Sequence, residues 1–299
     1  MKPVNHVVFP LSLIAETVTI LQGNGARFVT PAHFLPTAAR LRSRWDYLRE
    51  HAAWHTGRSD SISHLAWCID RVVRRRLLKR SAESLARPGR PEVFLQHDAD
   101  RNPENTLRVL RLERSLGAVS SAYFFRERSP RWPGDTEPYD LDIPAMQELE
   151  RDGFEIGYHL NGPERAGYDP DAGWRIIRDD LAFFRSHFHL RSFVPHGGLT
   201  GPKGENNHLI PHRDELADLI WFYNGRGLGA DLGWSDGMLE CPASTSLADP
   251  RELARRVQGR ARARFLFHPQ YYGDILRPNL EDVGVVHTAW WRALWPAAA

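Results

Sequence analysis

Residues 93–101 read Val93-Phe94-Leu95-Gln96-His97-Asp98-Ala99-Asp100-Arg101, an apolar strand that runs directly into two carboxylates. Side chains alternate along a strand, so Asp98 and Asp100 are expected on one face. Two neighbouring anions repel each other at neutral pH unless a cation or a shared proton offsets the cost. This stretch alone leaves two interpretations open: a divalent metal site at a strand end, or an acidic loop in which one aspartate caps the next helix.

The overall composition is that of an ordinary globular chain. With 299 residues, 42% of them hydrophobic and 25% charged, it is long enough for one large α/β domain, with or without a smaller appendage. A net charge of +2 gives no reason to expect nucleic acid or a membrane as a partner. No span reaches the ~18 apolar residues that a membrane helix needs, and Cys68 and Cys241 lack zinc-knuckle or disulfide-framework spacing. We therefore expect a cytoplasmic protein.

Residues 1–90 are expected to form a mainly helical extension that packs on the rest of the chain. Apolar residues recur at helical spacing over residues 13–21, just before Gly23, and again over residues 62–78. The second of these helices carries an arginine cluster, which is typical of the solvated side of an amphipathic helix, although it is also compatible with phosphate contact. Proline and glycine in residues 86–91 then end regular structure before the strand at Val93.

From residue 91 the pattern alternates strands with helices. Further strands are predicted over residues 120–125, 154–159, 191–195, 219–223 and 264–268, and helices over residues 103–116, 143–152, 174–188 and 250–260. Such alternation indicates a mainly parallel sheet, open or closed into a barrel. Functional side chains are then expected at the carboxyl ends of the strands.

Three histidines follow predicted strands in the same way as the two aspartates do. His159 and His268 end their strands, and His196 comes directly after Pro195. If these strands are parallel neighbours, the histidines converge with Asp98 and Asp100 on one mouth of the sheet. Imidazole and carboxylate together form a ligand set that suits zinc and related divalent ions, so the histidines favour the metal interpretation of the aspartate pair.

Four segments between residues 92 and 272 follow one another with the order and spacing of a known motif set: Val93–Phe125, Gly153–His159, Val194–Gly197 and Leu266–Pro269. Together they resemble the motifs of the polysaccharide deacetylase (NodB-homology) family. The resemblance implies an α/β fold, a distorted (β/α) barrel of about seven strands over residues 91–299, with residues 1–90 as its helical extension. It also implies a metal-dependent hydrolase of amides or esters.

The resemblance implies roles for the aspartate pair and for the last histidine. The family's first motif has adjacent aspartates, one a base and one a metal ligand, whereas Ala99 separates the pair here. By position Asp98 corresponds to the catalytic base and Asp100 to the ligand. His268 is then expected to protonate the leaving amine.

The remaining metal ligands are expected to be histidines. His159 matches the family's second motif, but Pro163 stands where that motif has its next histidine. The third ligand is therefore expected from His196, with Asn161 and Glu164 as weaker candidates. The ion itself is expected to be Zn²⁺.

We thus expect a metal-dependent hydrolase that removes an acyl group, such as acetyl, from an N-acylated carbohydrate or another small substrate. Asn161, Asp231 and Trp234 are the expected substrate-binding residues, although residues 225–237 are equally compatible with a plain surface loop. Residues 197–204 are expected to form a mobile loop at the site. Two alternatives remain: an inactive barrel that binds glycans or serves assembly, and a metal hydrolase of another carbon–nitrogen bond.

Overall fold

The computed structural model describes residues 9–34, 89–130, 138–197, 201, 205, 207, 214–216, 218–221, 230–236 and 249–276. The strands are β1 Phe9–Pro10, β2 Arg27–Phe28, β3 Glu92–Ala99, β4 Ser121–Phe124, β5 Glu155–Leu160, β6 Ser192–Pro195, β7 Ile220–Trp221, β8 Leu232–Ser235, β9 Arg262–Phe267 and β10 Tyr272–Gly273. The α-helices are α1 Ser12–Gly23, α5 Pro103–Ser115, α6 Ile143–Arg151, α7 Gly162–Arg165, α8 Pro170–His187 and α9 Pro250–Arg256. Short 3₁₀ helices are η1 Pro31–Phe34, η3 Asp214–Leu216 and η6 Pro269–Tyr271.

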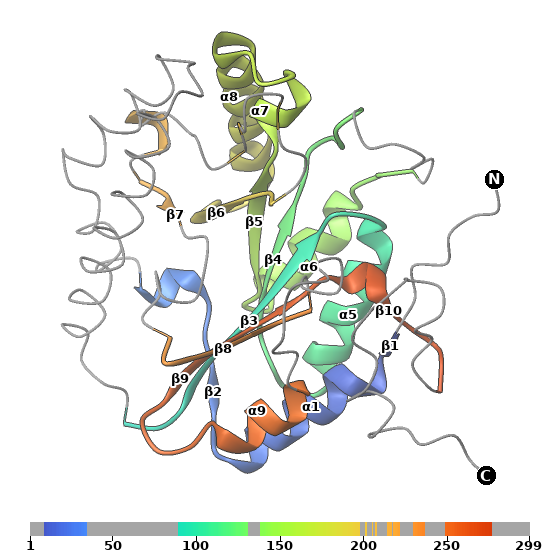
Figure 1. Cartoon of the computed structure of the whole chain (residues 1–299), viewed down its shortest axis with the longest axis vertical. Coiled ribbons are helices and arrows are strands. Elements are labelled where there is room, and N and C mark those ends of the chain that lie inside the picture. The colour runs from blue at the N-terminus through green and yellow to red at the C-terminus, as the bar shows by residue number, and fades with distance from the viewer. Residues whose placement is uncertain are drawn as a thin grey trace.

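The described residues are organised around an eight-stranded sheet (Figure 1). Seven of its strands follow one path in the order β7-β6-β5-β4-β3-β9-β8, and β2 pairs with β3 beside that path. All of these strand pairs are parallel. The sheet curls into a half-barrel, which confirms the predicted α/β fold with a distorted barrel. None of the helices in the described part of the chain is long and apolar enough to cross a membrane.

Four helices begin with the same local signal, an Asn or Asp whose side chain accepts a backbone N–H of the first turn, followed by a proline within two residues. The capping residues are Asn102, Asp142, Asp169 and Asp249, at the starts of α5, α6, α8 and α9. Asn102 therefore performs the capping role that one interpretation gave to the aspartate pair. Asp98 and Asp100 are left for another purpose.

The two faces of β3 contact different surroundings, and this difference places the aspartates. Val93 and Leu95 belong to a buried apolar cluster with residues of α1 and α9, whereas Phe94 packs with Tyr123 and Val194 on the concave side of the sheet. Strand alternation puts Asp98 on the concave side with Phe94, and Asp100 follows at the carboxyl end. The predicted shared face of the pair is confirmed.

The structure corrects several predicted elements. β8 occupies residues 232–235, inside the segment that is expected to be a loop. This segment is short and rich in glycine, so its sequence does not predict a strand. Pairing with β9 holds it in the extended conformation. The last helix ends at Arg256, before the expected residue 260. β2 joins the sheet through β3, so the sheet includes residues that precede residue 91. The predicted helix over residues 62–78, most of the loop over residues 197–204 and both cysteines lie outside the described residues.

Candidate metal centre

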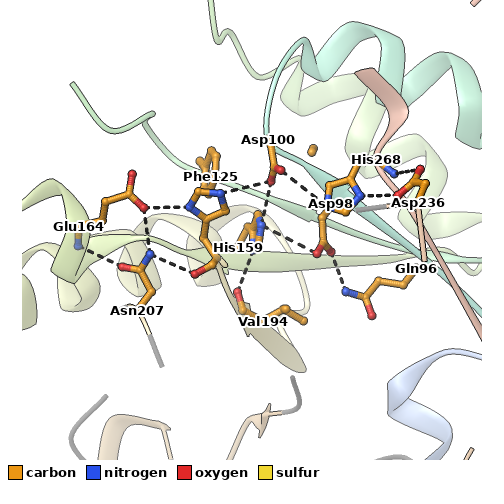
Figure 2. A network of polar contacts seen from close by, with 12 residues as sticks. Gln96, Asp98, Asp100, Phe125, His159, Glu164, Val194, Asn207, Asp236 and His268 are labelled. Carbon is orange, nitrogen blue, oxygen red and sulfur yellow. Dashed lines mark hydrogen bonds and ion pairs between the residues drawn. The ribbon is translucent and has the colours of Figure 1, made fainter. Parts of the chain in front are cut away.

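The site lies at the carboxyl ends of β3, β5, β6 and β9, where five polar side chains meet. These side chains are Asp98, Asp100, His159, His196 and His268, as the sequence predicts. Figure 2 shows four of them with labels: Asp98, Asp100, His159 and His268. β3 lies between β4 and β9 in the sheet, which places His268 beside the aspartates although about 170 residues of chain separate them. The convergence follows from the parallel direction of the strands, since all of their carboxyl ends lie at one edge.

Asp100, His159 and His196 form the tightest group in the site. The Asp100 Oδ1 atom lies 3.0 Å from His159 Nε2 and 3.9 Å from His196 Nε2, and one ligand atom from each residue lies within 4.8 Å of the other two. Ligand atoms around a tetrahedral Zn²⁺ ion are separated by about 3.3 Å, as bonds of about 2 Å require. The group is buried and matches the three-ligand sets that leave a fourth position open. These three residues can bind a divalent metal ion.

Both histidines of this group are held with Nε2 toward Asp100. The Nδ1–H group of His159 donates to the Val194 carbonyl at 2.9 Å, and that of His196 donates to Glu164 Oε2 at 2.9 Å. A carbonyl or carboxylate oxygen can only accept, so these contacts place the ring proton on Nδ1 and leave Nε2 as the ligand atom. Such partners are the usual companions of histidines that bind metals. Glu164, a weaker ligand candidate in the sequence, thus lies behind His196 and orients it.

Asn207 forms hydrogen bonds with both Glu164 and His196. Its side-chain amide donates to Glu164 Oε2 at 3.0 Å and to the His196 carbonyl at 3.1 Å, and its Oδ1 accepts the Glu164 N–H at 3.0 Å. All three residues are buried. No motif in the sequence pointed to Asn207, because it belongs to no strand or helix and its partners lie 11 and 43 positions away along the chain.

Phe125, directly after β4, packs against both histidines. Its ring stacks on His159 with centroids 4.8 Å apart and an interplanar angle of 2°, and it meets His196 edge-on at 5.0 Å. Phe125 is buried and covers one side of the two imidazoles. Packing as well as hydrogen bonding therefore restricts rotation of the His159 and His196 rings.

Asp98 is oriented from within the barrel. Gln96, two residues earlier on the same face of β3, donates from Nε2 to Asp98 Oδ1 at 2.7 Å, and Arg264 of β9 donates from Nε to Gln96 Oε1 at 2.9 Å. The other carboxylate oxygen of Asp98 lies 4.0 Å from His159 Nε2. Asp98 thus lies next to the proposed ligands with one oxygen already engaged, and its second oxygen faces the centre of the site.

His268 forms the opposite wall, and Asp236 holds it there. The His268 Nδ1–H group donates to Asp236 Oδ1 at 2.5 Å, the His268 backbone N–H donates to Asp236 Oδ2 at 2.7 Å, and Nε2 lies 3.7 Å from Asp100 Oδ2. Sequence reasoning missed Asp236. Asp236 directly follows β8, as Asp100 directly follows β3, but the sequence did not predict a strand at residues 232–235.

The charges of the site are strongly coupled. Burial alone would raise the pKa of Asp100, but the hydrogen bond from His159 and the nearby His196 and His268 outweigh it and lower that pKa. Burial alone would lower the pKa of His159, but Asp98 and Asp100 raise it. Asp100 and His159 thus each favour the charged form of the other, and a divalent ion takes the place of a proton at such ligands.

The pKa of His268 gives a test of its pairing with Asp236. Burial alone would lower this pKa, but Asp236, Asp100 and Asp98 raise it from the usual 6.5 to about 10. Because the folded-state pKa exceeds the unfolded one, this histidine stabilises the fold fully below pH 6.5, and the contribution is lost as the pH rises toward about 10. In metal-free Asp236→Asn we expect NMR titration of the His268 ring to move toward pH 6.5 and this loss of stability to shrink. An unchanged titration midpoint would contradict the pairing.

The structure places the three expected substrate-binding residues in different surroundings. Asp231 lies at the amino end of β8, far along the strand from the site, where its carboxylate accepts the Arg262 N–H at 3.1 Å. Trp234 is a core residue, 7% exposed, with its ring 5.1 Å from Phe267 in the cluster beneath α1 and α9. The structure therefore brings neither of them to the site, because β8 runs through a segment that was interpreted as a loop. Asn161 follows β5 two residues after His159 and donates to the Glu127 carbonyl at 2.9 Å; its contact with substrate stays a prediction.

No family model matches the chain, and no curated protein matches it. A solved structure of the CE4 family is similar to it. That structure is a crystal structure of a mutant of a CE4 family pseudoenzyme with restored enzymatic activity. The TM-score is 0.32 and the sequence identity 15%, and the similarity covers 62% of this chain and 62% of the other, which is less than two thirds of either length. CE4 is the polysaccharide deacetylase family, which the four sequence motifs resemble.

Proposed function

We propose that this chain is a metal-dependent hydrolase that removes an acyl group from an N-acylated substrate, with Zn²⁺ as its metal ion. The observation that carries the proposal is the buried group of Asp100, His159 and His196, with Asp98 on one side and His268 on the other. Both histidines in the group have their second ring nitrogen bound to an acceptor, which is the arrangement of histidines prepared for a metal. A capping or purely structural role explains neither the shared orientation of these side chains nor their burial.

Asp100, His159 and His196 would hold a divalent ion, which would supply Lewis acidity for polarising an acyl carbonyl and for lowering the pKa of water. Asp98 accepts the proton of the attacking water on its free carboxylate oxygen, while Gln96 holds the other oxygen. His268 faces Asp100 with Nε2, and Asp236 raises its pKa despite burial, so we assign to it the delivery of a proton to the departing nitrogen. Asp236 keeps the His268 ring facing the site during this transfer.

The acyl group and the carbohydrate character of the substrate are supported by the four motifs, in the order and spacing that the polysaccharide deacetylase family has. The site itself supports any amide whose carbonyl can approach Asp98 and whose nitrogen can approach His268. We therefore propose an N-acetylated sugar as the substrate class, with carbohydrate as the partner of this chain and the cytoplasm as its location.

The proposal is tested by metal analysis and by acetate release. Purified protein incubated with Zn²⁺ and then desalted is expected to retain one metal ion per chain, and to release acetate from at least one member of a panel of N-acetyl sugars. Chelation should abolish the release, and Zn²⁺ should restore it. Protein that binds no metal at stoichiometric level would contradict the proposal and favour a barrel that only binds glycans. Metal binding without hydrolysis of any N-acyl compound would point to another carbon–nitrogen bond.

A further inference from the structure

Tyr139 lies in the segment that leads into α6. It contacts a residue next to the two aspartates and a residue next to the two histidines. Its hydroxyl accepts a hydrogen bond from the Phe125 backbone N–H at 3.0 Å and donates one to the Ala99 carbonyl at 2.5 Å. Its ring lies 5.6 Å from the Phe125 ring. Ala99 separates the two aspartates, and Phe125 packs against the two histidines. One side chain thus connects the carboxylate half of the site with the imidazole half.

The hydroxyl lies where the pairing of β3 with β4 ends. The last registered pair of these strands is Ala99 with Phe124. The Phe125 N–H and the Ala99 carbonyl come next along the ladder, and the Tyr139 hydroxyl bridges them, so it continues the pairing by one step. Burial raises the pKa of the Tyr139 phenol well above its usual value, and the hydroxyl therefore keeps its proton and remains a donor to Ala99.

We propose that Tyr139 is a positioning residue of the metal centre, because its hydroxyl fixes the spacing between the strand end that carries Asp98 and Asp100 and the phenylalanine against which His159 and His196 pack. The proposed ligands come from strands that are not joined by any covalent link near the site, so their separation depends on such bridges. A metal centre requires its ligand atoms at defined separations, and supports of this kind typically contribute 10- to 100-fold to affinity, as an order-of-magnitude estimate. This inference adds a supporting residue to the proposed metal centre. It rests on the proposed function only in the experiment that measures metal binding.

The first test compares two tyrosine-to-phenylalanine variants. Tyr139→Phe keeps the ring and removes the bridging hydroxyl. Tyr158→Phe is the matched control: its hydroxyl donates to Asp180 Oδ2 at 2.8 Å on the face of β5 that packs against α8, away from the histidines. In competition with a chelator, we expect Tyr139→Phe to weaken Zn²⁺ binding by about 10- to 100-fold, and Tyr158→Phe to leave it unchanged. Wild-type affinity in a folded Tyr139→Phe protein would overturn the inference.

The second test needs no metal. Crystal structures of the metal-free wild type and of Tyr139→Phe give the distance between Asp100 Oδ1 and His159 Nε2, which is 3.0 Å here. In the variant, we expect this distance to exceed the hydrogen-bond limit of roughly 3.5 Å. An unchanged separation would overturn the positioning role whatever the metal content of the protein. Failure of the wild type to bind metal would refute the proposed function, and this distance would still decide the role of Tyr139.

Discussion

Replacing Asp100 with alanine is expected to remove the bound metal from the protein and, with it, all measurable hydrolysis. Asp100 supplies the only carboxylate of the three proposed ligands, and its Oδ1 atom faces both imidazoles, at 3.0 Å from His159 Nε2 and 3.9 Å from His196 Nε2. Loss of an outer-shell partner typically costs 10- to 100-fold in metal affinity, so loss of a direct ligand should weaken affinity by more than about 100-fold. Elemental analysis after desalting measures the outcome directly.

The matched control for this variant is Asp179→Ala, which removes an exposed carboxylate from α8 and should retain one metal ion per chain. Circular dichroism of both variants distinguishes metal loss from unfolding. A folded Asp100→Ala protein with a full metal complement would contradict the assignment of Asp100 as a ligand, and it would require the metal to be held by another group of side chains.

Replacing Asp98 with asparagine is expected to leave the metal in place and to slow hydrolysis by about 100- to 10,000-fold, the usual contribution of a general base. Asparagine has nearly the same shape, and its side-chain oxygen can still accept the Gln96 amide that Asp98 Oδ1 now accepts at 2.7 Å. It cannot take a proton from water. The measurements are kcat for acetate release from the best substrate of the panel and metal content from the same preparation.

The two aspartate variants together separate the roles of the pair. If Asp98→Asn loses its metal as Asp100→Ala does, Asp98 is a ligand and the division of the pair is wrong. If Asp98→Asn retains both metal and wild-type kcat, another group accepts the proton. Asp179→Asn, the corresponding change on the surface of α8, should alter neither quantity.

The aspartate pair was largely predictable because its placement depends on local rules. A strand that ends in Asp98-Ala99-Asp100 puts both carboxylates on one face, whatever lies beside it. The cap of α5 was equally local, since Asn102-Pro103 is a common helix start, and it left the aspartates free for a site. The histidines required one more assumption, that the strands before them run parallel.

The errors lie where neighbours along the chain carry little information. The interpretation of Asp231 and Trp234 as cleft residues failed because β8 forms only through its pairing with β9, and once that strand exists Asp231 lies at its wrong end and Trp234 packs in the core. Asp236 was missed for the same reason. Its contact with His268 joins residues that directly follow two neighbouring strands but lie 32 positions apart in the chain.

The sequence by itself determined the alternation of strands and helices, the carboxyl-end position of Asp98, Asp100, His159, His196 and His268, and the chemistry of that residue set. These follow from side-chain periodicity and chain direction, which are local properties. Only the tertiary structure decided which strands are neighbours, and therefore that Glu164, Asn207 and Asp236 orient the histidines and that Tyr139 bridges two strand ends. Those contacts depend on the curl and register of the sheet, which arise from packing over the whole domain.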